Sequence, residues 1–473
     1  MSAVLATLRT LDHVILAYVV LVDVVQSILL SAAALDLRRH RRDTRHAMRN
    51  RMLGSAVLPR VSVLAPAYNE QATVVASVTA LLTLRYPQLE VVVVNDGSPD
   101  STMQVLQDAF DLAPVPQTFR RVLPTADVRA VLRSRSNPRL VVVDKANGGK
   151  ADALNVGLCV ATGELVCAID ADTLIEPDAL MQMTRPFLEH DDCVAVGGVI
   201  RVANGSSVAQ GRVVEARTPR AFLPGVQSVE YLRAFLFGRL GWNRLGGNLI
   251  ISGAFGLFRR EDLLATGGYL HGSVGEDMEI VARLRRRTRE GVPASVLFVP
   301  DPVAWTEVPT SLRVLGRQRD RWHRGLTQTL WTYRSSWGNA RDGALGLVVY
   351  PYFVMVELLA PVVEAVGIVG LTLGLVLHAV DLPFAFAFFL FAYGYGAMLS
   401  MIAILLDTIA AAHPPGRRDI LLLAACAVLE PVGYRQLTVV WRLRGIVRAL
   451  QGHSDWGVMT RTGFTPEGAR VLD

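Results

Sequence analysis

The sequence predicts an α/β domain with a mainly parallel sheet, joined to helices that lie in a membrane. Two observations carry this prediction. Between about residues 58 and 340, apolar strand-like runs alternate with helical stretches, as in domains built from βα units. Long apolar segments flank this block, and the chain is 51% hydrophobic and 19% charged, with a mean hydropathy of +0.34. This composition is too apolar for a soluble enzyme of 473 residues.

The net charge of +6 at pH 7 is carried mainly by arginine. In an apolar chain, arginine clusters beside membrane segments favour an anionic lipid surface over nucleic acid as the partner. The four cysteines have neither the pairing of a disulfide framework nor the spacing of a zinc site. We therefore expect buried, reduced thiols at Cys159, Cys167, Cys193 and Cys426.

The first apolar segment runs from Val14 to Leu35 and is followed by an arginine-rich stretch from Asp36 to Arg45. It is long enough to span a bilayer and too long for the core of a signal peptide. Its basic flank predicts an anchor whose C-terminal end faces the cytoplasm. Asp23 lies inside this segment, where we expect it to make a polar contact with another helix.

Apolar segments return near the C-terminus, at about 345–378, 383–407 and 419–440. The first is long enough for one tilted helix or for a hairpin broken near Pro361. Glu357 and Glu364 lie seven residues apart on one face of it, and we expect them to pair with arginine or backbone. The end of the last segment is amphipathic and is expected to lie along the membrane surface. Arginines lie both before and after this last segment, and both groups favour the cytoplasmic side of the membrane. Both can lie there only if one segment does not cross the membrane fully.

These patterns divide the chain into five regions. They are an N-terminal transmembrane helix with a basic flank, a catalytic domain, interfacial amphipathic helices, a C-terminal transmembrane region and a cytoplasmic tail, at residues 1–50, 51–310, 311–343, 344–442 and 443–473.

Polar side chains follow the first two predicted strands. The strand from residue 60 to 66 leads to Tyr68 and Glu70, and the strand from residue 90 to 94 leads to Asp96. The carboxyl ends of parallel strands meet at one edge of a sheet, where nucleotides bind. Neither a phosphate-binding loop of the ATPase type nor a dinucleotide fingerprint is present, which argues against an ATPase and a dehydrogenase.

A later strand, residues 165–169, ends in Asp170 and Asp172. Side chains two residues apart on an extended chain point the same way, so both carboxylates can address one cation or one diphosphate. The alternative is that an aspartate here merely caps the next helix.

The stretch from residue 108 to 137 holds three prolines and is predicted to be an elaborated surface connection. Beyond it, Lys150 follows the glycine turn Gly148-Gly149 at the start of a helix. A lysine at such a turn can meet phosphate oxygens as a point charge, and the alternative is a solvated lysine beside a loop.

Two further features supply candidate acceptor and base groups. Residues 251–258 are predicted to form a strand whose small residues, including Ser252 and Gly253, let a ligand lie close to the backbone. Glu276 and Asp277 precede an apolar helical stretch. One of these two acids can cap that helix, which is the alternative to a catalytic role, and the other can serve as a general base.

A helix carrying Gln318, Arg321 and Trp322 closes the block. At positions i, i+3 and i+4 these side chains share one face, and an amide, a guanidinium and an indole together can hold a sugar ring and a diphosphate. The alternative is an amphipathic helix at the membrane interface, and both interpretations can hold together.

This set of motifs resembles the family 2 glycosyltransferases, and more narrowly the membrane-embedded processive synthases of cellulose, hyaluronan, chitin and poly-N-acetylglucosamine. The resemblance covers about residues 58–335 and the membrane layout. Its motifs are Tyr68-Asn69-Glu70, Asn95-Asp96-Gly97-Ser98, Gly149-Lys150-Ala151, Asp170-Ala171-Asp172, Gly275-Glu276-Asp277 and Gln318-Arg319-Asp320-Arg321-Trp322.

The resemblance implies a Rossmann-like GT-A fold and inverting transfer of a sugar from a nucleotide donor, most often a UDP-sugar. By the same resemblance, Asp96, Glu70 and Tyr68 contact the nucleoside and Lys150 lies near the phosphates. Asp172, with Asp170, holds Mg²⁺ or Mn²⁺ on the diphosphate.

The acceptor side follows from the same resemblance. Asp277, beside Glu276, is the base that deprotonates the acceptor hydroxyl. The acceptor site is lined by Ser252 and Gly253, and Gln318, Arg321 and Trp322 support the leaving diphosphate and stack the acceptor sugar. Gly275 stands where many relatives have threonine, which bears on specificity more than on activity.

The leading hypothesis is a processive polysaccharide synthase of the inner membrane, with a cytoplasmic catalytic domain and helices that pass the chain outward. A non-processive transferase acting on a lipid carrier or glycolipid is the alternative. A catalytically inactive scaffold is disfavoured by the presence of Asp96, Asp172 and Asp277, and a transporter by the size of the nucleotide-type domain. A partner protein in the envelope is not specified by the sequence.

Overall fold

The structure is a computed structural model that describes residues 2–50, 58–116, 119–170, 173–209, 211–289, 291–378, 380, 382–410 and 415–453. Asp172 and the tail beyond residue 453 lie outside these residues. The described chain forms two compact units. The sheet unit comprises residues 39–219 and 248–308, and the helical unit comprises residues 2–38, 220–247 and 309–453. One segment inside the predicted catalytic range, Arg220–Gly247, thus belongs to the helical unit.

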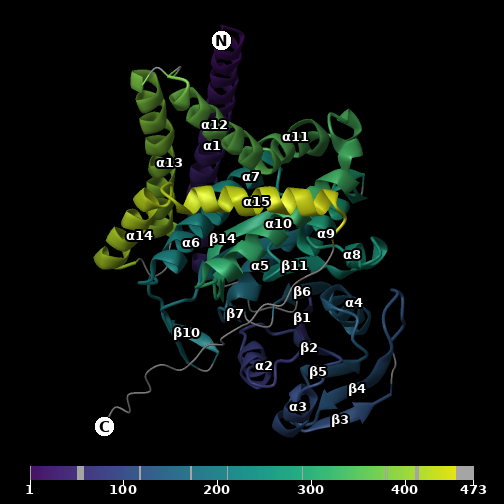
Figure 1. Cartoon of the computed structure of the whole chain (residues 1–473). Helices are drawn as coiled ribbons and strands as arrows, with labels where there is room; N and C mark the ends of the chain where they lie inside the picture. The colour runs from purple at the N-terminus through teal and green to yellow at the C-terminus, as the bar shows by residue number, and fades with distance from the viewer. Residues whose placement is uncertain are drawn as a thin grey trace. The chain divides into compact units, whose positions relative to one another are not determined.

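The sheet unit is built on one sheet, for which the described residues supply ten strands in the order β3-β4-β5-β2-β1-β6-β11-β8-β14-β7 (Figure 1). β5, β2, β1 and β6 run parallel to one another, and so do β8 and β14. β3, β4, β11 and β7 are antiparallel to their neighbours. The bounds are β1 Val61–Ala67, β2 Leu89–Asp96, β3 Leu112–Val115, β4 Val128–Ser134, β5 Leu140–Lys145, β6 Leu165–Ile169, β7 Leu174–Ile175, β8 Cys193–Val202, β11 Phe255–Arg259 and β14 Ser295–Thr306. The predicted α/β class with a parallel core is confirmed.

Helices pack against this sheet. Val92 and Val94 of β2 lie in a core shared with α4 and α9, whereas Val91 and Val93 are buried on the opposite face. A strand covered on both faces explains the run of four valines that the sequence shows there. The helices are α2 Val74–Leu82, α3 Thr102–Phe110, α4 Lys150–Val160, α5 Ala179–Glu189, α8 Arg260–Ala265 and α9 Glu276–Arg285. Two small hairpins complete the unit, β9–β10 (Ser207–Ala209 and Arg212–Glu215) and β12–β13 (Thr288–Arg289 and Val292–Pro293).

Two predictions about this unit were wrong. Residues 108–137, predicted as an elaborated surface connection, contain β3 and β4, which extend the main sheet. Pro114 lies in β3, the outermost strand on its side, where a residue without an N–H is tolerated. The strand predicted at 251–258 begins only at Phe255, so Ser252 and Gly253 lie in the turn before it.

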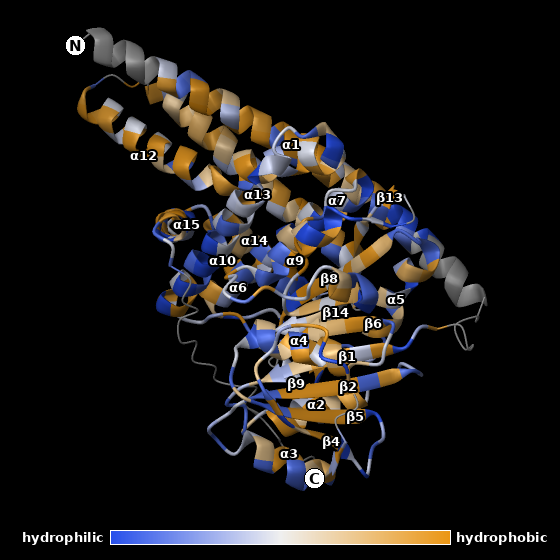
Figure 2. Ribbon diagram, turned by 90° about the vertical axis from the view of Figure 1, so that its right-hand side faces the viewer, coloured by the Kyte–Doolittle hydropathy of each residue, from blue (hydrophilic) through white to orange (hydrophobic). Residues whose placement is uncertain are grey.

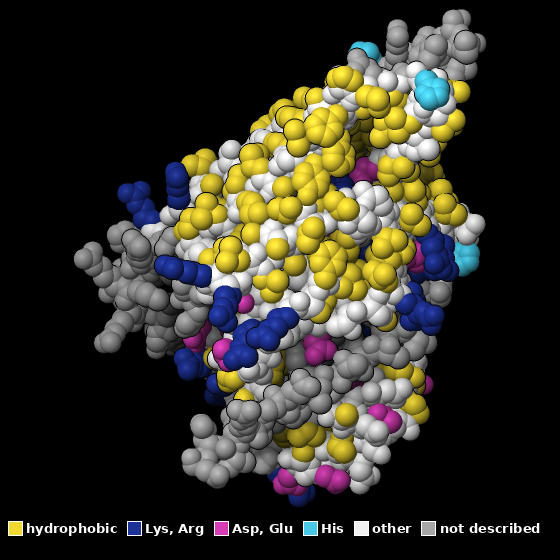
Figure 3. All heavy atoms as spheres, turned by 60° about the vertical axis from the view of Figure 1, so that its left-hand side comes forward, with side chains coloured by type: hydrophobic (Ala, Val, Ile, Leu, Met, Phe, Trp, Pro, Cys, Tyr) yellow, Lys and Arg dark blue, Asp and Glu magenta, His cyan; other side chains and the backbone are white. Residues whose placement is uncertain are grey.

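The helical unit contains the membrane candidates. Three helices in the described residues are long and apolar enough to cross a bilayer, at Thr10–His40, Leu345–Val376 and Ala385–Ile409. The segment after Leu345 therefore qualifies as one span and need not be a hairpin. Figure 2 shows α1, α12 and α13 as predominantly apolar helices, and Figure 3 shows apolar side chains spread widely over one side of the molecule.

All four cysteines are free and buried, as expected.

The remaining elements of the helical unit are shorter. Their bounds, with those of the spans, are α1 Ser2–Asn50, α6 Phe222–Leu232, η1 Arg233–Arg239, α7 Leu240–Leu245, α10 Leu312–Thr332, η2 Arg334–Ser336, η3 Ala340–Asp342, η4 Leu345–Val349, α11 Tyr350–Tyr352, η5 Phe353–Leu358, α12 Ala360–Val376, α13 Leu382–Ala410, α14 Arg417–Leu429 and α15 Tyr434–Leu450.

The predicted apolar run at 419–440 is divided between two helices. α14 and α15 are bent by 62° at a break that contains Pro431 and Gly433, and Gly433 has a φ of 80° that a residue with a side chain rarely adopts. We call this break, residues 430–433, the elbow. If the bent pair forms one broken span, the number of candidate spans rises to four.

Beyond the elbow, α15 runs across α10 (Figure 1). The two helices approach closely at two glycines. A Cβ atom at Gly316 would lie 2.8 Å from the Trp441 ring, and one at Gly445 would lie 2.6 Å from the carbonyl oxygen of Asp320. Arg448 of α15 also donates to the Asp320 carboxylate over 3.0 Å. α15 is therefore a fixed support for the helix that carries Gln318, Arg321 and Trp322.

Candidate active site

The loops after β1 and β2 are tied together at the carboxyl edge of the sheet. The backbone N–H of Asn69 donates to Ser98 Oγ over 3.1 Å, and that of Glu70 donates to Thr102 Oγ1 over 2.9 Å. Asn69 adopts a left-handed φ of 57°, which turns the chain sharply after β1. The Tyr68 side chain is left half exposed, at 50%. Tyr68 and Glu70 thus lie where the sequence predicts a nucleoside site.

Asp96 is buried, and both of its carboxylate oxygens are used inside the protein. Oδ1 accepts from the backbone N–H of Gly148 over 3.0 Å and from Lys145, and Oδ2 accepts from the N–H of Gly149 over 2.7 Å and from Asn147 over 3.2 Å. Gly149 has a φ of 86°. Asp96 therefore holds the glycine turn that precedes α4.

Lys145 has a fully buried side chain and lies between two carboxylates. It pairs with Asp96 and, over 2.7 Å, with Asp152. Asp152 in turn accepts from the backbone N–H of Ala126. A buried lysine is tolerated only when it is paired in this way. The sequence motifs predicted no role for Lys145 or Asp152, although a lysine at the end of a valine-rich strand is a recognisable signal.

Lys150 lies five residues further on and joins two of the predicted site residues. Its Nζ atom lies 2.6 Å from Asp170 Oδ1 and 3.1 Å from Glu276 Oε1. Burial alone would lower the pKa of Lys150, but the two carboxylates outweigh burial, and the pKa is raised. Lys150 is thus firmly protonated, and its side chain remains 22% exposed.

Glu276 opens α9, and its carboxylate is almost completely buried beneath Lys150. Burial raises its pKa, against the opposing effect of the Lys150 charge. The helix cap is the preceding residue, Gly275, so neither acid takes the predicted capping position.

Asp277 lies beside this cluster and is partly exposed. Its Oδ2 atom accepts from the backbone N–H of Gly253 over 3.2 Å, and its Oδ1 atom accepts from the N–H of Met278 over 2.9 Å. A Cβ atom at Gly253 would lie 3.5 Å from both the Lys150 Nζ atom and the Asp277 Cβ atom. Because Gly253 has no side chain, it leaves space open between the Lys150 ammonium group and the partly exposed Asp277 carboxylate.

The structure thus brings together Lys150, Asp170, Gly253, Glu276 and Asp277 within the sheet unit. Within the described residues, no group of three or more histidine, cysteine, aspartate or glutamate side chains forms a metal site. Of the two predicted metal ligands, Asp170 is described and Asp172 is not.

Gln318, Arg321 and Trp322 belong to α10 in the helical unit, and the structure confirms that one helix carries all three. Trp322 is 45% exposed. The Arg319 guanidinium lies over the Trp322 ring, 4.5 Å from its centroid. Arg319 lies within the motif of this helix, but the sequence predicted no separate role for it.

Comparison with known proteins gives concordant results. A poly-beta-1,6-N-acetyl-D-glucosamine synthase of Staphylococcus epidermidis is 28% identical over 303 residues, which is 64% of this chain and 61% of that protein. The Staphylococcus aureus protein of the same name is 26% identical over 274 residues, 58% of this chain and 56% of that protein. The matched part of the chain thus spans about three fifths of the length of these relatives.

The fold is similar to that of a mannosyltransferase from Pyrobaculum calidifontis solved in complex with GDP-Man and Mn²⁺. The TM-score is 0.52 with 19% sequence identity, over 92% of this chain and 99% of that one. The predicted GT-A fold is therefore confirmed. The sequence profile of the family described as "Glycosyltransferase like family 2" matches residues 59–325, more than half of the chain. The chain accordingly belongs to glycosyltransferase family 2.

Proposed function

We propose that this protein is an inverting glycosyltransferase that moves a sugar from a nucleotide donor to a growing polysaccharide. The proposed donor is a UDP-sugar. The observation that carries the proposal is the cluster of Lys150, Asp170 and Glu276 beside the partly exposed carboxylate of Asp277. A fixed cation suits a diphosphate leaving group, and a single accessible carboxylate suits a base.

In this proposal Asp277 removes the proton from the acceptor hydroxyl. Its hydrogen bond from the backbone N–H of Gly253 orients the carboxylate. Lys150 compensates negative charge on the diphosphate as the sugar leaves, and Glu276 holds Lys150 in place from below. Tyr68, Glu70 and Asp96 contribute to the nucleoside site, Asp96 by shaping the glycine turn.

A divalent cation, Mg²⁺ or Mn²⁺, fits this chemistry. Hard cations prefer oxygen ligands, and Asp170 presents a carboxylate that is 28% exposed at the edge of the sheet. Asp170 and Asp172 would hold the ion, which would neutralise charge on the departing diphosphate. The solved mannosyltransferase of similar fold was crystallised with Mn²⁺.

The proposed acceptor is a polysaccharide, in line with the names of the staphylococcal relatives. Gln318, Arg321 and Trp322 would bind the acceptor sugar and the diphosphate. The candidate spans favour a multi-pass protein of the cell membrane, and the arginines at the end of the Thr10–His40 span favour a cytoplasmic catalytic unit. Coupling of synthesis to export is part of the same proposal.

The first experiment is a donor panel. Purified protein with Mn²⁺ is mixed with UDP- and GDP-sugars, and release of the nucleoside diphosphate is measured. We expect one UDP-sugar to be turned over and Asp277→Asn to reduce release by about 1,000-fold, since a positioned base contributes about 10²–10⁴-fold. Asp178→Asn, an exposed aspartate paired with Arg85, is the matched control and should leave turnover unchanged. Full turnover by Asp277→Asn would overturn the assignment of the base.

Product length then tests processivity. Mass spectrometry of the product should show long chains, whereas products that carry one added sugar would favour the non-processive transferase acting on a lipid carrier.

A further inference from the structure

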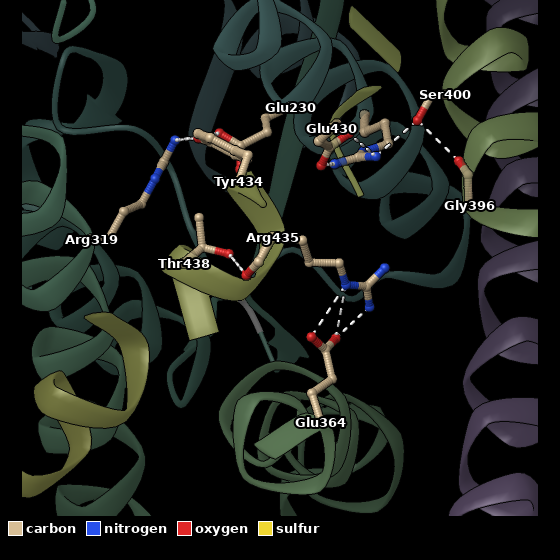
Figure 4. A network of polar contacts seen from close by, with 10 residues as sticks. Glu230, Arg319, Glu364, Gly396, Ser400, Glu430, Tyr434, Arg435 and Thr438 are labelled. Atoms are coloured by element: carbon tan, nitrogen blue, oxygen red, sulfur yellow. Dashed lines mark hydrogen bonds and ion pairs between the residues drawn. The ribbon is translucent and has the colours of Figure 1, made fainter. Parts of the chain in front are cut away.

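A network of charged side chains surrounds the elbow in the helical unit (Figure 4). Its members come from α6, η1, α10, α12 and α13 as well as from the two ends of the elbow itself. The sequence predicted that Glu364 pairs with arginine or backbone, and its ion pair with Arg435 confirms this; it predicted no contact for the other members. Two parts of the network can be separated by what they touch.

The first part consists of Glu230 of α6, Arg319 of α10 and Tyr434 at the start of α15. The Arg319 Nη2 atom donates to Glu230 Oε2, and the Tyr434 hydroxyl donates to the same oxygen over 2.8 Å. Arg319 also donates to the Tyr434 hydroxyl over 3.4 Å. The three side chains form a closed triangle, and the Arg319 and Tyr434 side chains are buried. The guanidinium of Arg319 is therefore held in one orientation.

This triangle reaches Trp322 through Arg319. The guanidinium carbon of Arg319 lies 4.5 Å from the centre of the Trp322 ring, in the arrangement of a cation–π contact. Trp322 itself is 45% exposed. An exposed tryptophan ring can rotate about its side-chain bonds, and a guanidinium fixed against one face restricts that rotation while leaving exposed ring surface for a ligand.

The second part of the network fixes the elbow without touching Trp322. Arg233 of η1 donates to both carboxylate oxygens of Glu430, one of them over 2.6 Å, and also to Ser400 of α13. On the other side of the elbow, Arg435 donates to Glu364 of α12. These contacts involve neither Arg319 nor Trp322, so they supply ion pairs with which the triangle can be compared.

We propose that Glu230 and Tyr434 are positioning residues for the acceptor sugar. They hold the Arg319 guanidinium against Trp322, and the Trp322 ring, fixed in this way, stacks the sugar that receives the next residue. This inference rests on the proposed function of Trp322 as the acceptor platform. It adds Glu230 of α6 and Tyr434 of α15 as the residues outside α10 that set the orientation of the Trp322 ring.

The first test does not depend on catalysis. The full-length protein in detergent is labelled with 5-fluorotryptophan, and the ¹⁹F resonance of Trp322 is assigned by its loss in Trp322→Phe. We expect Glu230→Gln to shift or broaden this resonance, because the released guanidinium no longer restrains the ring. Glu364→Gln removes a carboxylate from the neighbouring ion pair and should leave the resonance unchanged. An unchanged Trp322 resonance in Glu230→Gln would overturn the inference and leave the proposed function untouched.

The second test measures steady-state kinetics with UDP-N-acetylglucosamine as the donor and a β-1,6-linked N-acetylglucosamine pentamer as the acceptor. The acceptor is a short form of the polymer in the name of the staphylococcal relatives. Glu230→Gln should raise the KM for the pentamer about tenfold and leave the KM for the donor unchanged. Tyr434→Phe should act in the same direction with a smaller effect, and Glu364→Gln should change neither KM.

A double-mutant cycle shows whether Glu230 acts through Arg319. Arg319→Met alone should raise the acceptor KM, and adding Glu230→Gln should then have no further effect. If Glu230 acts only through Arg319, the effects of the two substitutions on KM are not additive. Additive effects, or a rise in the donor KM that equals the rise in the acceptor KM, would contradict the inference. If Trp322→Ala keeps the wild-type kcat and the wild-type KM for the acceptor, the platform and the inference are both wrong, while the transferase assignment stands.

Discussion

Lys145 and Lys150 flank the same glycine turn, and each lies between two carboxylates. Lys145 pairs with Asp96 and Asp152 and has no exposed surface. Lys150 pairs with Asp170 and Glu276 and keeps 22% of its side chain exposed. A lysine between two acids is therefore not by itself a sign of an active site. The two lysines differ in whether a ligand can reach them. Only Lys150 can exchange a carboxylate partner for a phosphate without opening the core.

The largest expected effect is that of Lys145→Met on stability. The substitution leaves two buried carboxylates without their cation, which costs about 3–5 kcal/mol for a buried pair. Denaturant unfolding of the purified protein should show a midpoint well below that of the wild type. The double variant Lys145→Met/Asp152→Asn should recover part of the loss. A stability equal to that of the wild type would mean that this triad does not hold the turn.

Lys150→Met should show the opposite pattern. We expect kcat/KM to fall about 100-fold, equivalent to about 2.7 kcal/mol, because the cation aimed at the diphosphate is lost. Asp170 is partly exposed, and Glu276, whose pKa is raised, can take up a proton, so the unfolding midpoint should fall less than in Lys145→Met. Lys150→Arg retains the charge and should restore part of the activity. If Lys150→Met unfolds as readily as Lys145→Met, the distinction between a structural and a functional lysine is wrong.

Glu276→Gln should give a smaller effect, about tenfold in kcat, equivalent to about 1.4 kcal/mol, since Lys150 keeps Asp170 as a partner. This variant also tests a pH dependence. Burial raises the pKa of Glu276 above its usual 4.5, although Lys150 opposes the shift. As the pH rises from 4.5 to the pKa in the folded protein, Glu276 is ionised in the unfolded chain and protonated in the folded one, so this residue reduces stability progressively.

The measurement for this prediction is the unfolding free energy of both proteins across that pH range. The wild type should lose stability relative to Glu276→Gln as the pH rises from 4.5, and the difference should level off above the folded pKa. A difference that does not change with pH would show that Glu276 is not held in a raised-pKa environment.

Much of the fold could be predicted because its signals are local. The valine run of β2, the alternation of strands and helices, and the polar residues after each strand all follow from short stretches of sequence. Strand β3 was missed because Pro114 is a poor strand residue everywhere except at an edge, and the edge position is a property of the whole sheet. Strand β4 has no proline, but the exposed residues Arg129 and Arg133 interrupt its apolar pattern.

The candidate site was predicted as a set of residues but not as a set of contacts. The sequence placed Lys150 near phosphates, and the structure adds that Asp170 and Glu276 hold it. The burial of Asp96 was not predictable, because its partners Lys145, Asn147 and Gly149 lie about 50 residues further along the chain. Similarly, Glu230 and Tyr434 lie far in sequence from Arg319, so no motif joins them.

The most direct test of the account separates binding from transfer in two variants. UDP affinity and single-turnover transfer of a radiolabelled sugar are measured for Asp277→Asn and Lys150→Met. The account predicts that Asp277→Asn keeps the UDP affinity of the wild type and loses transfer by about 1,000-fold. It predicts that Lys150→Met loses UDP affinity as well as transfer. Transfer at the wild-type rate by Asp277→Asn, or UDP affinity unchanged in Lys150→Met, would contradict the assignment of base and phosphate-binding cation.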